Sequence, residues 1–289
     1  MRPFVASGDD GYAYRSKLTP TVKRGVVGFR GATAHCAVRK CPIAHPALAQ
    51  ALAALSDEHA SKQTRHLPLL LRVDEREGVL AAATRPHAVV EQTVLGQRFQ
   101  FKANDFFQTG HRGVLDRLVL AVREAVPAGG HVVDAYCGVG LFAISLGVSA
   151  LRVTGIEINR ASVDFARRNA AANGIGERAT FHAADANRLF DRLDDAVDDA
   201  PVTLVVDPPR AGCSSDFVRQ VRTRLRPQRI VYVSCHVATQ KRDVDALCAA
   251  ADGDGDGAAA YRLVSLQGFD LFPQTRHVES VVVLERVEV

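Results

Sequence analysis

A cysteine stands at the point where a buried stretch of the chain ends. Residues 231–233, Val-Tyr-Val, are β-branched and aromatic and predict a buried strand, and Ser234, Cys235 and His236 lead from it into a polar stretch that predicts a helix. In an open α/β sheet, the carboxyl ends of the strands face the crevice that binds ligands, where a thiol can act as a nucleophile. The alternative is a cysteine that packs as a small apolar residue, and Cys235 taken alone favours that alternative.

A second polar segment follows another predicted strand. Residues 202–206 are apolar, and the sequence DPPRAG follows at residues 207–212. The two prolines restrict the backbone to an extended shape and hold the loop open. We therefore expect Asp207 and Cys235 at the same edge of one sheet.

Acidic residues end further predicted strands and indicate a nucleoside site. Residues 131–136 lead into a glycine turn and a helix, the next strand ends at Glu157, and the third leads to Asp185. An acid about 20 residues after such a turn is placed to hydrogen-bond ribose hydroxyls, and the third acid is placed to meet an adenine amino group. The turn has no dinucleotide fingerprint, so the pattern favours S-adenosylmethionine over NAD. A structural turn with a chance acid is the alternative.

The elements that position these groups alternate from about residue 104 onward. Strands are predicted at residues 131–136, 152–158, 179–183, 202–206 and 229–233, and helices at residues 114–126, 141–146, 161–173, 215–225 and 239–251. This alternation predicts a parallel, doubly wound α/β sheet. Residues 261–269 and 280–286 predict two strands with no helix between them, and hence an antiparallel hairpin that ends the sheet.

The front third of the chain has a different pattern, typical of a smaller α+β domain. Short strands are predicted around residues 25–29, 67–73, 78–84 and 99–101, and a helix at residues 46–55. We expect two domains, 1–103 and 104–289. The low-complexity segment DGDGDG at residues 252–257 predicts an exposed loop.

The composition is that of an ordinary globular protein. The 289 residues are 47% apolar with a net charge of +4, which permits an anionic partner without demanding one. There is no apolar run that could span a bilayer and no secretory signal, so we expect no membrane association, a cytoplasmic location (or a nuclear one in a eukaryote), and cysteines that remain thiols. A monomer is the default expectation.

Five motifs occur in a fixed order along the chain. They are NDFFQT (104–109), DAYCGVG (134–140), DPPRAG (207–212), YVSC (232–235) and FPQTRHVE (272–279). The ordered set resembles the RNA (uracil-5-)-methyltransferase family, which forms 5-methyluridine in tRNA and ribosomal RNA, and is similar above all to its tRNA-type members. The resemblance extends from about Tyr14 to Arg286. It implies a class I, Rossmann-like methyltransferase sheet.

The resemblance also implies roles for individual residues. Cys235 would be the nucleophile that adds to C6 of uracil, and Glu279 the general base that removes the C5 proton. The thiol needs a lowered pKa, for which His236 and Arg210 are the candidates. The implied S-adenosylmethionine contacts are Gln108, Tyr136, Gly138, Leu141, Glu157, Asp185 and Asp207.

An RNA substrate is the expected partner, with tRNA favoured and ribosomal RNA as the alternative. The target base must leave its stack, which calls for a cationic surface. Candidate cations are Lys17, Lys23, Arg24, Arg30, Arg65 and Arg112, together with the arginines of residues 219–229, and each of them could equally be a solvated surface charge. The rival functions are methylation of an exocyclic amino group, which uses no cysteine, and a non-catalytic RNA-binding role.

Two departures from the family bear on domains and metals. Nothing before Tyr14 resembles the small β-barrel with which many relatives begin. Cys41 resembles the last of four cluster-binding cysteines of some bacterial relatives, but the other three are absent. A zinc site built from Cys36, Cys41 and the neighbouring histidines His35 and His45 is the alternative, and we assign no metal.

Overall fold

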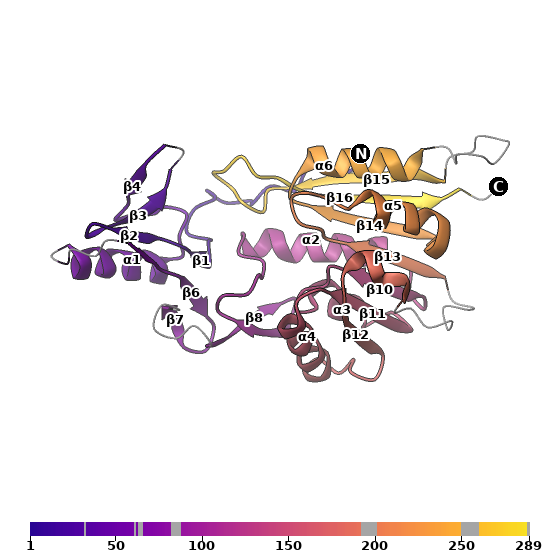
Figure 1. The fold of residues 1–289 in the computed structure, drawn as a ribbon, viewed down its shortest axis with the longest axis horizontal. Coiled ribbons are helices and arrows are strands. Elements are labelled where there is room, and N and C mark those ends of the chain that lie inside the picture. Colours follow the sequence, from indigo (N-terminus) through magenta and orange to yellow (C-terminus); the bar gives the residue numbers. More distant parts are fainter. Residues whose placement is uncertain are drawn as a thin grey trace. The chain divides into compact units, whose positions relative to one another are not determined.

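A computed structural model describes residues 1–31, 33–60, 62, 66–81, 88–191, 201–249 and 260–287. The chain forms two compact units, which are coloured along the sequence in Figure 1. The first comprises Met1–Ala6, Gly113–Leu271 and Arg276–Val289, and the second Ser7–Arg112 and Phe272–Thr275. The division of the protein into domains 1–103 and 104–289 stays a prediction. The predicted loop 252–257 and Arg65 lie outside the described residues.

A seven-stranded sheet forms the centre of the first unit. Its order is β12 (Ala179–Ala183), β11 (Arg152–Glu157), β10 (His131–Ala135), β13 (Val202–Val206), β14 (Arg229–Ser234), β16 (Glu279–Arg286) and β15 (Tyr261–Phe269). Strands β10 to β14 are parallel, and β16 is antiparallel to both β14 and β15. The predicted doubly wound sheet with an antiparallel pair is confirmed, and its strand order reverses between β10 and β13, where such sheets bind ligands.

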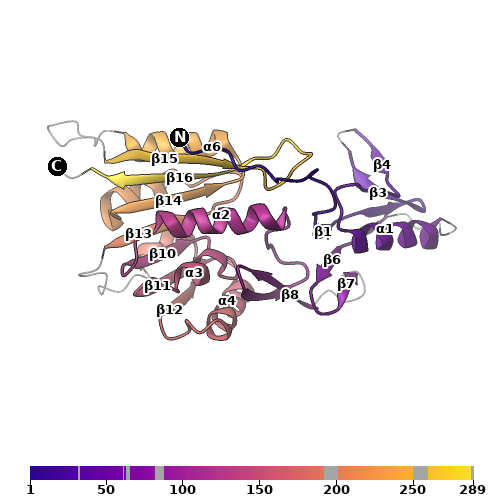
Figure 2. The same cartoon turned by 180° about the vertical axis from the view of Figure 1, so that it is seen from behind.

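Helices cover both faces of this sheet. They are α2 (Arg112–Ala125), α3 (Leu141–Leu146), α4 (Arg160–Ala172), α5 (Ser215–Gln220) and α6 (Val237–Cys248). Figure 1 shows α5 and α6 in front of the sheet, and Figure 2 shows α2 in front of the opposite face. Phe217 of α5 and Leu247 of α6 pack with Leu204, Ile230 and Leu284 of the sheet in one buried cluster. Within the described ranges, no helix is long and apolar enough to cross a membrane.

The second unit is an α+β fold with short strands. Helix α1 (Pro46–His59) packs with strands of two small sheets, β1 (Lys17–Leu18), β6 (Leu71–Asp74) and β7 (Gly78–Ala81) in one, and β4 (His35–Ala37), β3 (Val26–Arg30), β2 (Thr21–Lys23) and β5 (Leu67–Pro68) in the other. A separate hairpin consists of β8 (Val89–Val94) and β9 (Gln97–Lys102).

One predicted strand of this unit was wrong in its extent. Residues 67–73 form β5 and β6, which belong to different sheets, and not one continuous strand. Pro68 has no amide hydrogen to continue a ladder, and pairing with β2 ends there. Of the predicted strand 78–84, the structure describes β7, and residues 82–84 lie outside the described ranges.

A buried arginine holds the segment that carries the NDFFQT motif. The guanidinium of Arg72 is fully buried and donates to the carbonyl oxygens of Ala103 at 3.2 Å, Asp105 at 2.7 Å and Phe107 at 3.4 Å. It also lies 4.4 Å from the centroid of the Phe101 ring. Burial lowers its pKa only to about 10, so the arginine stays charged at neutral pH. Its carbonyl partners thus fix the backbone just before Gln108.

Candidate active site

The register of two strands places Cys235 next to Glu279. Strands β14 and β16 are antiparallel, and Ser234 lies opposite Ser280. Cys235 follows Ser234 and Glu279 precedes Ser280, so both residues lie one step beyond this pair, at the same edge of the sheet. Glu279 is buried, with 3% of its surface exposed, and Cys235 is half-buried. The sequence named both residues, but their adjacency depends on β16 entering the sheet between β14 and β15.

Acidic groups around the thiol set its protonation. Burial raises the pKa of Glu279 to about 8, and the nearby Asp207 carboxylate adds to that rise. Burial likewise raises the pKa of Asp207 to about 7. The pKa of the Cys235 thiol is raised by burial and then by the charges of Glu279 and Asp207. Without a ligand, the thiol is therefore protonated at neutral pH.

Arg210 is the group that opposes this rise. Its charge and a side-chain hydrogen bond to Cys235 act to lower the pKa of the thiol, and its charge also acts to lower that of Glu279. Its Nη2 lies 3.3 Å from both ring nitrogens of His277. The other candidate, His236, caps helix α6: its Nδ1 accepts from the Thr239 amide at 3.3 Å. Of the two, Arg210 is thus the cation that acts on the thiol.

Helix α6 connects the carboxyl end of β14 to the amino end of β16 through the side chain of Gln240. The amide group of Gln240 donates to the Tyr232 carbonyl at 2.9 Å, and the Ser280 hydroxyl donates to Oε1 of Gln240 at 2.6 Å. Both side chains are buried. Hydrogen bonds between buried polar groups fix their geometry, so the strand ends that carry Cys235 and Glu279 are held in register.

The glycine turn after β10 is open to a ligand at one of its two glycines. A Cβ added at Gly138 (φ +55°) would meet nothing within 4 Å, whereas one at Gly140 (φ +96°) would come within 2.8 Å of Cδ1 of Ile144. Gly140 therefore serves packing, and Gly138 leaves space at the edge of the sheet. The turn is closed by the Gly140 amide, which donates to the Cys137 carbonyl at 2.9 Å.

Two of the predicted nucleoside contacts lie where the strand pattern predicted them. Glu157 ends β11; its Oε2 accepts from the Gly138 amide at 3.1 Å and its Oε1 from the Asn159 amide at 2.8 Å. Asp185 is exposed after β12, and its Oδ1 accepts from the Asn187 amide at 2.8 Å. Each carboxylate oxygen can accept a further hydrogen bond, so both groups can also serve a ligand.

Asp134 is a buried acid that had no predicted role. Its Oδ2 accepts from the Ala143 amide at 2.8 Å, and its Oδ1 has no hydrogen-bond partner among the described residues. Burial raises its pKa to about 8, and the charges of Asp207 and Glu157 add to the rise. The signal was present in the sequence, because an aspartate in an otherwise apolar strand has to be compensated by something.

The remaining predicted cofactor residues lie in different settings. The Tyr136 ring packs against Phe217 of α5, with ring centroids 5.8 Å apart, and its backbone has a positive φ of 66°. Leu141 is buried as the first residue of α3. Gln108 belongs to the second unit, whereas Tyr136, Gly138, Leu141, Glu157, Asp185 and Asp207 belong to the first.

No metal centre is found in the part of the chain that the structure describes. There, no group of three or more His, Cys, Asp or Glu side chains is placed to hold a metal ion. Two residues of the zinc alternative have other partners: the His35 Nε2 is 3.1 Å from the Val26 carbonyl, and His45 caps α1 by accepting from the Ala47 amide at 3.3 Å.

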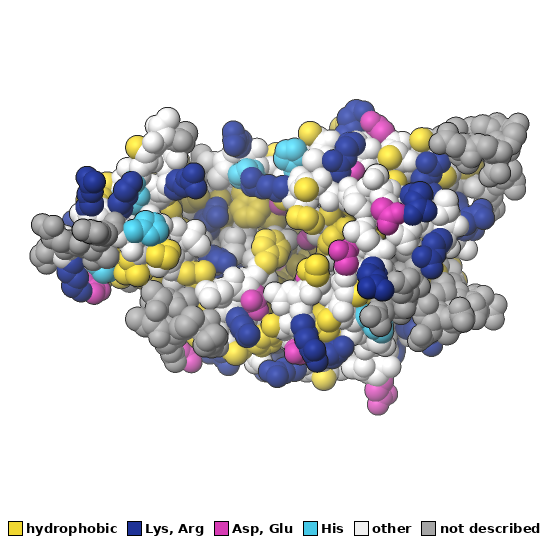
Figure 3. Space-filling view, viewed as in Figure 1, with side chains coloured by type: hydrophobic (Ala, Val, Ile, Leu, Met, Phe, Trp, Pro, Cys, Tyr) yellow, Lys and Arg dark blue, Asp and Glu magenta, His cyan; other side chains and the backbone are white. Residues whose placement is uncertain are grey.

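The predicted RNA-facing cations are largely engaged within the protein. Arg112 pairs with Glu75, and Lys17 donates to the Asn104 carbonyl at 3.4 Å. In the arginine-rich segment, Arg219 pairs with Asp216 and Arg229 with Glu285. Figure 3 shows basic side chains dispersed over the face that carries α5 and α6, with acidic ones between them. The described residues of this face thus form no single basic patch.

Comparisons with known proteins give the family and the fold. The tRNA (uracil-5-)-methyltransferase family profile matches residues 48–287. Two curated relatives are named tRNA (uracil(54)-C(5))-methyltransferase: that of Saccharomyces cerevisiae is 35% identical over 81% of this chain and 37% of its own length, and that of Schizosaccharomyces pombe is 32% identical over 96% and 55%. The chain thus spans about a third to a half of their length.

A solved structure is similar over nearly the whole chain. The Pyrococcus abyssi tRNA (uracil-54, C5)-methyltransferase, solved in complex with S-adenosyl-L-homocysteine, has a TM-score of 0.75 and 23% identity, and the match covers 97% of this chain and 78% of that one. The likeness confirms the predicted class I methyltransferase fold.

Proposed function

The chain belongs to the tRNA (uracil-5-)-methyltransferase family, and from this premise we propose that it transfers a methyl group from S-adenosylmethionine to C5 of a uridine in RNA. The observation that carries the proposal is the juxtaposition of Cys235 and Glu279 at one edge of the sheet, with Arg210 beside the thiol. The names of the two yeast relatives favour tRNA as the substrate, and ribosomal RNA is the alternative.

The residues at this edge fit the proposed cofactor. Gly138 leaves open space, and the carboxylate of Glu157 ends the neighbouring strand, as a ribose site requires. Asp134, Asp207 and Glu279 have raised pKa values because burial disfavours their charged forms. A ligand with a sulfonium and an ammonium group would bring positive charge to these acids and favour their ionised forms. When bound, S-adenosylmethionine supplies an electrophilic methyl group.

Cys235 would activate the base. The thiol loses its proton to solvent, and Arg210 stabilises the thiolate by charge and hydrogen bond. The thiolate forms a bond to C6 of uracil, and the electron pair of the C5–C6 double bond moves into the ring as an enolate. C5 then has the electron density to take the methyl group, which an unactivated uracil lacks.

Glu279 would complete the turnover. After methylation C5 carries both the methyl group and its original proton, and the Glu279 carboxylate takes that proton. The C5–H electron pair restores the C5–C6 double bond, and the C6–S bond breaks with its electrons returning to sulfur. In the free protein a pKa of about 8 leaves Glu279 mostly protonated at neutral pH, so Glu279 would first lose this proton to solvent. The carboxylate that results is a stronger base than an ordinary glutamate.

A trapping experiment tests this chemistry. The protein would be incubated with S-adenosylmethionine and a T-arm RNA that carries 5-fluorouridine at the target site. Because fluorine is not removed as a proton, the wild type should form a covalent RNA adduct that survives denaturing electrophoresis. Cys235→Ala should form none, and the control Cys248→Ala, at a half-buried cysteine on the last turn of α6, should form it as the wild type does.

The outcomes separate the rival functions. An adduct that persists in Cys235→Ala would exclude this cysteine as the nucleophile. Methylation of an unmodified RNA by Cys235→Ala would indicate an exocyclic amino target instead. A wild type that binds S-adenosylmethionine but forms no adduct with T-arm or ribosomal RNA fragments would overturn the proposal. A wild type that binds RNA, but neither binds S-adenosylmethionine nor forms an adduct, would favour the non-catalytic role.

A further inference from the structure

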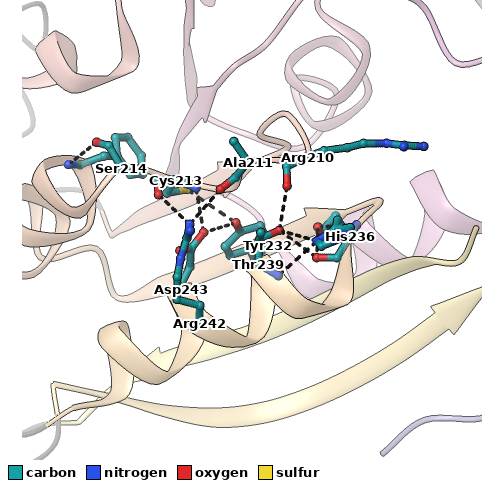
Figure 4. Close-up of polar contacts among 11 residues, drawn as sticks. Arg210, Ala211, Cys213, Ser214, Tyr232, His236, Thr239, Arg242 and Asp243 are labelled. Atoms are coloured by element: carbon teal, nitrogen blue, oxygen red, sulfur yellow. Dashed lines mark hydrogen bonds and ion pairs between the residues drawn. The ribbon is translucent and has the colours of Figure 1, made fainter.

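An ion pair on helix α6 joins the buried Asp243 to the exposed Arg242 and lies outside the group of reacting residues. Asp243 is buried, and its Oδ1 accepts from Nε of Arg242 at 2.8 Å and from Nη2 at 2.7 Å. Its Oδ2 accepts from the Tyr232 hydroxyl at 2.6 Å and from the Cys213 amide at 2.7 Å. Figure 4 shows these contacts converging between the helix and the loop that follows β13. One carboxylate thus links α6, β14 and that loop.

Side chains of the same helix also donate hydrogen bonds to backbone carbonyl groups of the loop, residues 210–213. Nη2 of Arg242 donates to the Ala211 carbonyl at 2.9 Å and to the Cys213 carbonyl at 3.0 Å. The Thr239 hydroxyl donates to the Arg210 carbonyl at 3.1 Å. Three carbonyls and one amide of residues 210–213 are therefore bound from α6, which leaves this short segment little freedom.

The close approach of loop and ion pair depends on a glycine. Gly212 has φ +76°, and a Cβ there would come within 2.5 Å of Oδ2 of Asp243 and 2.7 Å of Nη2 of Arg242. A side chain at this position would push the loop away from the pair, in addition to straining the backbone. The loop is thus built to lie directly on the Asp243–Arg242 pair.

The residues tied together by Asp243 lead directly into the reacting group. Tyr232 is fully buried in β14, three positions before Cys235. At the other end of the loop, the Arg210 side chain points away from the Asp243 cluster while its carbonyl oxygen faces Thr239 (Figure 4). The backbone that Asp243 anchors is therefore the backbone from which the Arg210 guanidinium reaches the thiol.

We propose that Asp243, together with Arg242 and Tyr232, is the positioning group of this site: it fixes the backbone of residues 210–213 against β14 and thereby sets the Arg210 guanidinium beside Cys235. The inference rests on the proposed function in taking Cys235 as the nucleophile. Asp243 touches no reacting atom, so its role is positioning, exerted through Arg210.

The reactivity of the thiol should report this role. The groups that face Cys235 are Glu279 from β16 and Asp207 and Arg210 from the loop after β13, and of these only Arg210 lowers its pKa. The groups that face Asp243 are Tyr232, Cys213 and Arg242. If the loop is released, Arg210 loses its place, the two carboxylates dominate, and the pKa of Cys235 rises further.

The experiment measures alkylation of Cys235 by iodoacetamide as a function of pH, with peptide mass spectrometry and with neither RNA nor cofactor present. In Asp243→Asn the half-point should move to higher pH, and the rate at a fixed neutral pH should fall about three- to tenfold, the effect of half to one pKa unit. The matched control is Asp245→Asn, an exposed aspartate of the same helix paired with Lys241, which should alkylate as the wild type does.

The same substitution made in an Arg210→Met protein separates an effect through Arg210 from a general loosening of the fold. In Arg210→Met the thiol has already lost its cation, so adding Asp243→Asn should change the alkylation profile little. An unchanged Cys235 profile in Asp243→Asn, or an equal shift with and without Arg210, would overturn the proposal. If Asp243→Asn does not fold, Tyr232→Phe decides: a smaller shift in the same direction supports the proposal, and no shift contradicts it.

These outcomes are independent of the methyltransferase proposal. Alkylation needs no substrate, so the shift can be observed even if the fluorouridine adduct never forms. A shift in alkylation without an adduct would support the positioning role and contradict the proposed reaction. An adduct without a shift would support the reaction and contradict the positioning role.

Discussion

Two regions of this molecule bury charge in opposite ways. In the second unit, Arg72 is fully buried, yet three backbone carbonyls accept its hydrogens, and its pKa falls only to about 10. At the carboxyl edge of the large sheet, Asp134 and Glu279 are equally well buried, and the pKa of each rises to about 8. The arginine keeps its charge at neutral pH, and the two acids largely lose theirs.

The difference shows how the surroundings decide what a buried charge is for. Both terminal nitrogens of Arg72 have carbonyl partners, so its charge is part of the architecture, although its Nε has no partner among the described residues. Asp134 and Glu279 are each affected by the charge of Asp207, and one oxygen of Asp134 has no partner among the described residues. A charge that the protein leaves uncompensated is destabilising in the free chain, and it is favourable when a cationic ligand or a proton arrives.

The largest change in stability is expected when Arg72, the donor to three backbone carbonyls, is replaced. Arg72→Met keeps most of the side-chain volume but leaves three carbonyls, two of them buried, without their donor, so the free energy of unfolding should fall by about 3–5 kcal/mol. Urea unfolding followed by circular dichroism measures this. The control Arg39→Met removes an exposed arginine paired with Asp57 and should cost less than about 1 kcal/mol. If both variants lost the same free energy of unfolding, the buried partners of Arg72 would contribute no special stability, and the contrast with the acids would fail.

A gain in stability is expected at the sheet edge. Glu279 has a folded-state pKa of about 8, above its unfolded value, so the native state loses stability as pH rises from about 4.5 to about 8. Glu279→Gln removes that loss and should be more stable by about 1–3 kcal/mol at pH 8, with the gain shrinking toward pH 5. Under the proposed function, the same variant should also fail to remove the C5 proton.

The measurement is thermal or urea unfolding at both pH values, with the exposed Glu177→Gln as the matched control. A Glu279→Gln protein that is less stable than the wild type at pH 8 would mean that the carboxylate has compensating partners, and the contrast with Arg72 would fail.

The smallest effect is expected at Asp134. Its pKa is raised to about 8, so Asp134→Asn also removes a loss of stability that grows with rising pH. The asparagine oxygen can still accept from the Ala143 amide, but its amino group would take the place of the partnerless oxygen and find no acceptor there. The two effects nearly offset, and we expect a net gain of about 1 kcal/mol at pH 8. Urea unfolding at pH 5 and pH 8 measures this difference. A large loss of stability in Asp134→Asn at pH 8 would show that the native protein stabilises the charged form of Asp134.

The central strands of the large sheet were predictable because burial on both faces gives them a simple pattern; β10 and β13 are buried throughout, whereas the edge strands β12 and β15 are half-buried or exposed at most positions. Strands β12, β13 and β15 have the predicted bounds, and β10, β11 and β14 differ by one residue at an end. Continuous apolar runs mark buried parallel strands whatever surrounds them. In the second unit, the alternating polar sequence of β8 (VVEQTV) carries a weaker signal and was not predicted, and the split at Pro68 depends on which sheet each half joins.

The sequence motifs name individual site residues, whose roles stay predictions, but they do not predict how these residues are arranged. Motifs pointed to Cys235, Asp207 and Glu279, yet only the register of β14 and β16 makes the cysteine and the glutamate neighbours. Asp243 belongs to no motif. A signal existed, because it shares the buried face of α6 with Gln240 and Leu247, and an acid on such a face needs partners. Sequence alone does not tell which strand and which loop supply them.

The position of β16 also sets when Cys235 and Glu279 can first become neighbours during synthesis of the chain. The strand that brings Glu279 is inserted between β14 and β15, both of which are made before it. A nascent chain in which β10 to β14 have formed therefore holds Cys235 without Glu279 beside it, and β15 without the strand that separates it from β14. Cys235 and Glu279 become neighbours only when residues 279–286 insert between β14 and β15, so the proposed site is completed by the last strand of the sheet to be synthesised.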